Sequence, residues 1–181
     1  MAAAISGYDT AQYLLDRANI HDTLSKIPLF YDYHDTTGLL NEVYAPEITI
    51  DYSSLLGGEP FTVDRKEWIG RMIKVFEGFS KAQHFITGIV TDLPQPGGVD
   101  TQRPTTVTVK GETGASLVSL PSEDGTTTIS QNGGLVEARL QFFSDLEAKS
   151  LNPWRVTYYK VIKTWDKGDA AILKESGKHV K

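Results

Sequence analysis

Histidine side chains are the groups in this sequence that could transfer protons near neutral pH. The chain contains four of them and no cysteine. Imidazole ionises close to neutral pH, whereas carboxyl and phenol groups do so only when their surroundings shift the pKa. The lack of thiols excludes disulfides, thiolate nucleophiles, iron–sulfur clusters and cysteine zinc sites. The four histidines are His21, His34, His84 and His179.

His84 lies in residues 82–93, which we predict to form a β-strand. Alternate residues of a strand point to one face, so Ile86, Gly88 and Val90 share the face of His84. A histidine among apolar neighbours is either a hydrogen-bonded core residue or a general acid/base that moves protons on carbon beside a carbonyl. Both interpretations are open from the residues alone.

Two tyrosines and an aspartate could complete such a site. Tyr52 is the last apolar position of the alternating segment 48–53, which predicts a strand with its apolar face inward. Its phenol is either a core hydroxyl with one partner or a donor that polarises a substrate carbonyl. Tyr31 could supply a second donor, and Asp32 could orient His84 and stabilise its protonated form.

Other charged residues have two possible roles each. His34 follows a predicted helix end and is either an exposed capping residue or a second acid/base at a pocket mouth. Glu137 and Arg139 alternate with apolar residues on a predicted strand. They form either an ion pair on a solvated face or a polar pocket wall. In the second case Arg139 binds a phenolate, enolate or carboxylate, and Glu137 holds the guanidinium in place.

The elements that must position these residues indicate an α+β domain. Apolar residues recur every three or four positions in the first third, which is typical of a helix, and Pro28 should kink or divide that helix. Asp64 is a good N-cap for a later helix, and a short closing helix is expected over 169–175. The remaining pattern predicts four long antiparallel strands over 82–93, 105–120, 133–146 and 154–165.

The composition fits one soluble globular domain over residues 1–181, with short tails at 1–10 and 176–181. Of the 181 residues, 40% are hydrophobic and 23% charged, and the net charge is −5. An acidic chain is unsuited to a phosphate backbone, so we expect no nucleic-acid partner. The longest apolar run is residues 1–5, whereas a membrane span needs about 20. We therefore expect no membrane contact and a cytoplasmic location.

Three short segments resemble one family. Residues 45–54 fit the pattern Ala-Pro-x-x-x-Ile-Asp-Tyr-x-Ser, and residues 83–88 fit Gln-His-Phe-Ile-x-Gly. Residues 31–35 fit Tyr-Asp-x-x-Asp. These segments are similar to the SnoaL-like and scytalone-dehydratase-like branch of the nuclear-transport-factor-2-like superfamily. The resemblance implies a cone-shaped, curved antiparallel sheet wrapped around N-terminal helices, described as an α+β barrel.

The resemblance also assigns roles to residues. It implies that His84 is the catalytic acid/base, that Tyr52, Tyr31 and Asp32 assist it, and that Phe85 contacts the substrate. The second histidine of scytalone dehydratases has no counterpart in residues 107–117. Their Ser and Asn of the next strand correspond, by approximate register, to Glu137 and Arg139.

Our hypothesis is a cofactor-independent lyase or isomerase, of dehydratase or cyclase type, that acts on a polyketide-like or aromatic ketone in secondary metabolism. The alternative is a non-catalytic module for binding a small molecule or for dimerisation. No metal-ligand or nucleotide-binding spacing is present, so neither a metal nor a cofactor is implied. The expected partners are a small-molecule substrate and further copies of the chain, in a dimer or trimer.

Overall fold

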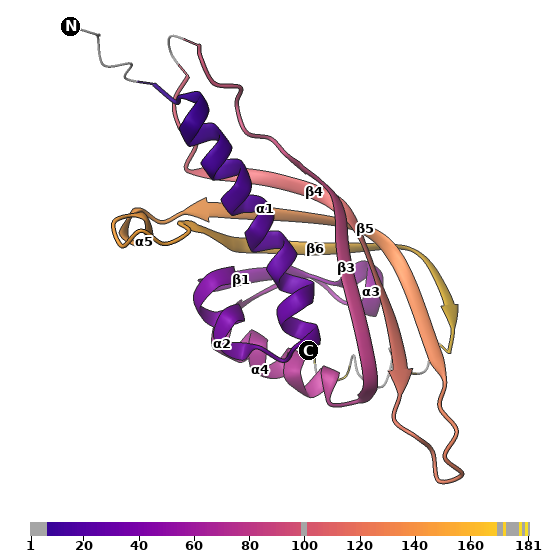
Figure 1. The fold of residues 1–181 in the computed structure, drawn as a ribbon. Coiled ribbons are helices and arrows are strands. Elements are labelled where there is room, and N and C mark those ends of the chain that lie inside the picture. Colours follow the sequence, from indigo (N-terminus) through magenta and orange to yellow (C-terminus); the bar gives the residue numbers. More distant parts are fainter. Residues whose placement is uncertain (1–6, 99–100, 170–171, 173–177, 179, 181) are drawn as a thin grey trace, which may run out of the picture.

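A computed structural model describes residues 7–98, 101–169, 172, 178 and 180. In this part of the chain, helices cover one face of a six-stranded sheet (Figure 1), so the expected α+β class is confirmed. The helical segments are α1 (Thr10–Asp32), α2 (Thr36–Gly38), the π-helical turn η1 (Leu39–Val43), α3 (Ser53–Leu56), α4 (Arg65–Phe76) and α5 (Ser144–Glu147). The strands are β1 (Tyr44–Asp51), β2 (Phe61–Asp64), β3 (Phe79–Thr91), β4 (Thr106–Ser119), β5 (Ile129–Phe142) and β6 (Trp154–Gly168).

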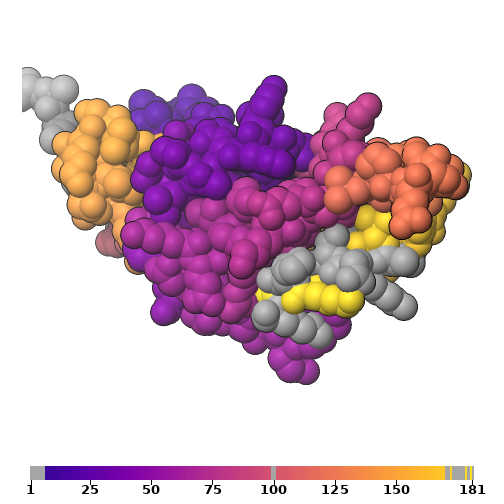
Figure 2. All heavy atoms as spheres, turned by 90° about the horizontal axis from the view of Figure 1, so that it is seen from below, coloured from indigo at the N-terminus to yellow at the C-terminus, as the bar shows by residue number. Residues whose placement is uncertain are grey.

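The sheet has the order β2-β1-β6-β5-β4-β3. Neighbouring strands are antiparallel except β1 and β6, which are parallel. The sheet is not closed, because β2 and β3 remain as edges, so the expected barrel is not formed. The four long strands β3 to β6 curve together, and α1 crosses them diagonally (Figure 1). From below, α5 and the turn between β4 and β5 lie at opposite ends of the molecule (Figure 2).

Helix α1 is capped at its start and is not divided at Pro28. The side chain of Asp9 accepts a hydrogen bond from the backbone N–H of Gln12 at 2.8 Å, which caps the first turn. The helix has 23 residues in total and includes Pro28. Helix α4 starts directly after Asp64, the predicted N-cap. The short helix expected over 169–175 falls mostly outside the described residues, and no helix in the described part is long and apolar enough to cross a membrane.

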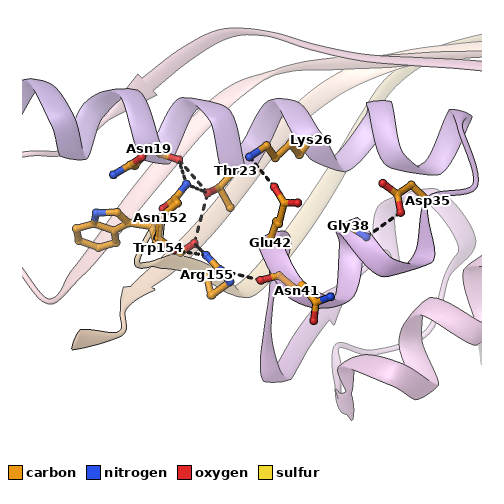
Figure 3. A network of polar contacts seen from close by, with 10 residues as sticks. All are labelled: Asn19, Thr23, Lys26, Asp35, Gly38, Asn41, Glu42, Asn152, Trp154 and Arg155. Carbon is orange, nitrogen blue, oxygen red and sulfur yellow. Dashed lines mark hydrogen bonds and ion pairs between the residues drawn. The ribbon is translucent and has the colours of Figure 1, made fainter. Parts of the chain in front are cut away.

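Buried polar contacts hold α1 against the sheet. Thr23 of α1 accepts a hydrogen bond from the side-chain amide of Asn152 at 3.0 Å, just before β6 (Figure 3). Arg155 of β6 is only 4% exposed and donates to the carbonyl oxygen of Asn41 at 2.7 Å. These contacts join α1, η1 and β6, and so they set where the C-terminal end of α1 lies over the sheet.

A buried carboxylate gives α1 a second anchor. Asp16 is completely buried and accepts hydrogen bonds from Tyr8, from the indole of Trp154 and from the guanidinium of Arg103. Arg103 also pairs with Glu147 at 2.6 Å. A buried charge is stable when it is paired and fully hydrogen-bonded, as it is here.

Candidate functional site

The C-terminal residue of α1 meets the middle of β3. Asp32 Oδ1 lies 2.7 Å from Nδ1 of His84, and Asp32 Oδ2 accepts the backbone N–H of the same histidine at 2.7 Å. Strand β3 is an edge strand, so alternate N–H groups on its outer edge have no neighbouring strand to bond. The aspartate therefore satisfies a free edge N–H and orients the imidazole at the same time.

The contact with Asp32 sets the chemistry of the His84 ring. A carboxylate can only accept hydrogen bonds, so Nδ1 bears the proton in the neutral imidazole. The described residues give Nε2 no hydrogen-bond partner, and the ring forms part of a cavity wall. Its edge also packs against Phe76 at 5.1 Å between ring centroids. His84 Nε2 is thus available to accept a proton from a molecule in the cavity.

A cavity of about 110 Å³ lies between α1, α4 and the long strands. Its walls are mainly aliphatic and aromatic, as is usual for a small-molecule site with a few orienting polar groups. The side chains with polar atoms on its walls are Tyr31, Tyr52, His84, Thr113, Asn132 and Tyr159.

The phenols around this cavity are neutral hydrogen-bonding groups at physiological pH. The hydroxyls of Tyr31 and Tyr44 lie 2.8 Å apart. Burial raises the pKa of Tyr31, Tyr52 and Tyr159 well above that of a free phenol. Burial also raises the pKa of Tyr44 to about 12, although the hydrogen bond with Tyr31 opposes the shift. Each phenol therefore retains its proton over the range in which His84 could work.

The fold agrees with a comparison to known families. The chain matches the SnoaL-like domain family over residues 12–158, more than half of its length. It belongs to the SnoaL-like family. No match is found among curated proteins.

Solved structures share the fold of this SnoaL-like domain at low sequence identity. The Kfla4162 protein from Kribbella flavida is 20% identical, with a TM-score of 0.72 over 88% of this chain and 97% of that one. A putative aromatic ring hydroxylase from Novosphingobium aromaticivorans is 17% identical, with a TM-score of 0.66 over 89% and 98%. A putative scytalone dehydratase from the same species is 11% identical, with a TM-score of 0.64 over 87% and 90%. These neighbours show that the chain has the nuclear-transport-factor-2-like fold.

The SnoaL-like domain brings four of the predicted site residues together. His84, Tyr31 and Tyr52 line one cavity, and Asp32 lies behind His84. Tyr52 was predicted inside the strand, but it lines the cavity from just beyond it, because β1 ends at Asp51 and Tyr52 has the dihedral angles φ −104° and ψ 20°.

Four other predicted residues do not line the cavity. For Glu137, Arg139 and His34 this agrees with the alternative of a solvated or exposed position, whereas Phe85, expected to contact the substrate, is not brought to the cavity. Glu137 and Arg139 lie on the outer face of β5, because the alternating Ala138 and Leu140 are buried under the helices. The Arg139 guanidinium lies 4.2 Å from the ring centroid of Tyr158 on that outer face. Phe85 is 47% exposed there, since it neighbours His84 on the strand and points the other way. His34 is exposed at the turn after α1, where its left-handed backbone conformation, with a φ of 54°, ends the helix.

Three polar residues of the cavity were missed by sequence reasoning. Asn132 was missed because the register of β5 was set too far along the chain: Ser130 and Asn132 have the Ser-x-Asn spacing expected of the family. Asn132 is the one asparagine of β5, so matching the family's asparagine to it would have revealed the error. Tyr159 and Thr113 face inward by simple alternation, and the Tyr158–Tyr159 pair is a signal that one phenol must point inward.

The described residues contain no cluster of three or more histidine, aspartate or glutamate side chains that could hold a metal ion. The polar groups of the cavity are one imidazole, one amide and several hydroxyls. Such a set can accept a proton and donate hydrogen bonds to a developing negative charge on oxygen.

Proposed function

We propose that this SnoaL-like domain is a cofactor-independent lyase or isomerase that acts by general acid/base catalysis on a polyketide-like or aromatic ketone in secondary metabolism. The main support is the His84–Asp32 pair on the wall of an apolar cavity, where Nε2 of the ring has no hydrogen-bond partner among the described residues. A base that is oriented by a carboxylate and faces a mainly apolar cavity is suited to abstract a proton from carbon. The low-identity neighbour named as a putative scytalone dehydratase is consistent with this class of reaction.

The reaction would begin with transfer of a proton from the α-carbon of the ketone to Nε2 of His84. The C–H electron pair then forms the carbon–carbon double bond of an enolate, and negative charge develops on the carbonyl oxygen. Tyr52 and Tyr31 would donate hydrogen bonds to that oxygen, which stabilises the enolate. In a dehydration, the imidazolium would return its proton to a β-hydroxyl, which leaves as water. In an isomerisation, the proton would return to another carbon.

Exchange of α-protons with solvent tests this proposal without knowledge of the natural substrate. In D₂O, the wild-type protein should speed deuterium uptake at the α-carbon of an aromatic ketone such as 1-tetralone, as followed by proton NMR. His84→Gln removes the base but retains an amide near Asp32, and it should lower the catalysed rate by about 10²–10⁴-fold. Tyr52→Phe removes one donor and should lower the rate by about 10²-fold.

The matched control is His34→Asn. His34 is an exposed histidine outside the cavity, and asparagine tolerates its left-handed backbone conformation. This variant should exchange protons at the wild-type rate. Equal rates for the wild type and His84→Gln would rule out His84 as the base.

One observation favours a second candidate function, a non-catalytic module that binds a small ligand. The inward positions on β4 hold Thr113, Ala115 and Leu117, so this strand offers the cavity no second acid/base. A rise in melting temperature with aromatic ketones, without any α-proton exchange, would support binding alone.

A further inference from the structure

Two more tyrosines belong to the environment of this cavity. Tyr159 of β6 lines the cavity together with Tyr52, and the ring centroids of these two residues lie 6.2 Å apart in an edge-to-face arrangement. Tyr44, the first residue of β1, is completely buried and contacts Tyr31 through the 2.8 Å hydroxyl pair. The mechanism proposed above uses Tyr31 and Tyr52 only, and so leaves these two phenols without a role.

The hydroxyl of Tyr159 is free to bind a ligand. The residue is only 4% exposed, yet its hydroxyl makes no hydrogen bond to any described residue. Most polar groups inside a protein are paired with protein or water. Tyr52 is only partly buried, and its hydroxyl likewise makes no hydrogen bond to any described residue. Two unpaired phenols on one cavity wall indicate that a ligand oxygen, or a water that precedes it, completes their hydrogen bonding.

Tyr44 is arranged to support Tyr31. Either hydroxyl of the pair can be the donor. When Tyr31 donates its proton to a ligand, Tyr44 can donate to the Tyr31 oxygen, and this chain of hydrogen bonds strengthens the donor that faces the ligand.

We propose that Tyr159 is a third direct donor to the ligand oxygen and that Tyr44 is a positioning residue for Tyr31, so that the cavity selects ligands whose oxygen is, or becomes, an enolate or phenolate. This inference rests on the proposed function, because it names the substrate class of the same site. Neutral phenols suit this task, since hydroxyls that carry no negative charge donate hydrogen bonds to an oxyanion without repelling it.

Binding of 4-nitrophenol tests the proposal, since the visible absorbance of its phenolate reports ionisation in the bound state. The measurement uses the His84→Gln protein, in which no imidazolium can attract the anion. We expect the bound phenol to ionise at a pH about one unit lower than in water, because the donors favour the phenolate. Tyr159→Phe should weaken phenolate binding by about tenfold, the loss typical of one hydrogen bond to a charged group.

Two comparisons separate donation from simple packing. Tyr158→Phe is the matched control, because Tyr158 directly precedes Tyr159 on β6 but faces the outer side, where its hydroxyl lies 3.4 Å from Asp51. It should leave binding unchanged. Tyr44→Phe should weaken 4-nitrophenolate binding but leave the affinity for 4-nitrotoluene, a neutral molecule of similar shape, unchanged. A purely structural role would weaken both ligands equally.

Three outcomes would overturn the proposal: absence of binding, binding of 4-nitrophenol in its neutral form, or equal effects of Tyr159→Phe and Tyr158→Phe. These outcomes are independent of the exchange experiment. A protein that binds phenolate through Tyr159 but does not exchange α-protons retains the oxyanion site and loses the proposed catalysis. If the Tyr159→Phe variant exchanges α-protons at the wild-type rate and binds phenolate with the wild-type affinity, the proposed catalysis stands. The proposed role of Tyr159 is then wrong.

Discussion

Asp32 contacts His84 through both carboxylate oxygens, and each contact restricts a different motion. The bond to Nδ1 fixes the ring orientation and the tautomer. The bond from the backbone N–H fixes the carboxylate relative to β3. Neither group has to reorganise when a proton reaches Nε2, and such preorganisation is the main means by which a protein lowers the barrier of a charge-forming step.

The tautomer argument predicts the effect of Asp32→Asn. The amide N–H of asparagine can donate to Nδ1, which moves the histidine proton to Nε2 and removes the lone pair from the cavity. We expect the maximal rate of α-proton exchange to fall by about 10²–10⁴-fold, with little change in the ketone concentration that gives half the maximal rate.

Asp35→Asn is the matched control for that substitution. Asp35 caps α2 by accepting the N–H of Gly38 at 2.8 Å, and asparagine caps helices equally well. The control should therefore keep the wild-type exchange rate. Similar rates for Asp32→Asn and the wild type would show that the carboxylate does not set the tautomer.

At the scale of elements, the site depends on how α1 is fixed along its length. Asp16 in the first half of the helix connects it to Trp154 of β6 and to Arg103. Asp32 at the other end connects it to β3. A helix fixed at two points to opposite parts of one sheet cannot tilt freely, so the distance between Asp32 and His84 is maintained by contacts far from the cavity.

This arrangement predicts that Asp16→Ala destabilises the protein strongly. Removal of the carboxylate leaves the Arg103 guanidinium, the Tyr8 hydroxyl and the Trp154 indole without their shared partner. Loss of one member of a buried ion pair costs about 3–5 kcal/mol, which urea denaturation would measure as a lower free energy of unfolding. Asp22→Ala, an exposed position on the same helix, should change this free energy by less than about 0.5 kcal/mol. Equal effects at both positions would contradict the anchoring role.

The elements with strong local patterns could be predicted from the sequence, and those set by distant partners could not. Long alternating segments located β3 to β6 to within a few residues, and Asp64 marked the start of α4. Strand β2 has only four residues and pairs with β1, so it has too little pattern of its own. The parallel pairing of β1 with β6 joins positions more than a hundred residues apart, which periodicity cannot encode.

The residues of the candidate site divide in the same way, into those that local sequence patterns predict and those that depend on distant strand pairing. Short motifs located His84, Asp32 and Tyr31, because local sequence determines where α1 ends and β3 runs. The inward side of β5 depended on its register, and an error there selected Arg139 in place of Asn132.

At the scale of the whole molecule, the outer face of the sheet has apolar groups that none of the described helices covers. A Cβ atom on Gly114 would collide with the ring of Phe85, and one on Gly133 would collide with the ring of Trp165. These two glycines are paired across β4 and β5, whereas Phe85 lies on β3 and Trp165 on β6. The two rings therefore reach from the flanking strands over the glycine pair. Both rings remain about half exposed, as does Leu135 beside them. We propose that this outer patch of Phe85, Leu135 and Trp165 is where copies of the chain associate in a dimer or trimer, since exposed apolar patches commonly mark interfaces.

A charge within this outer patch should separate the copies. We expect the wild type to have a molar mass in light scattering that is a multiple of the 20.0 kDa chain. Leu135→Glu should reduce this mass to that of one chain, because a carboxylate would have to be desolvated in the contact. Leu135 lies over no glycine, so its replacement leaves the aromatic covers of Gly114 and Gly133 intact and should not affect folding. Leu151→Glu changes an equally exposed leucine between α5 and β6, outside the sheet, and should leave the mass unchanged. A wild-type mass of 20.0 kDa at all concentrations would exclude this association, and would leave Phe85 and Trp165 only the role of shielding the glycine backbone.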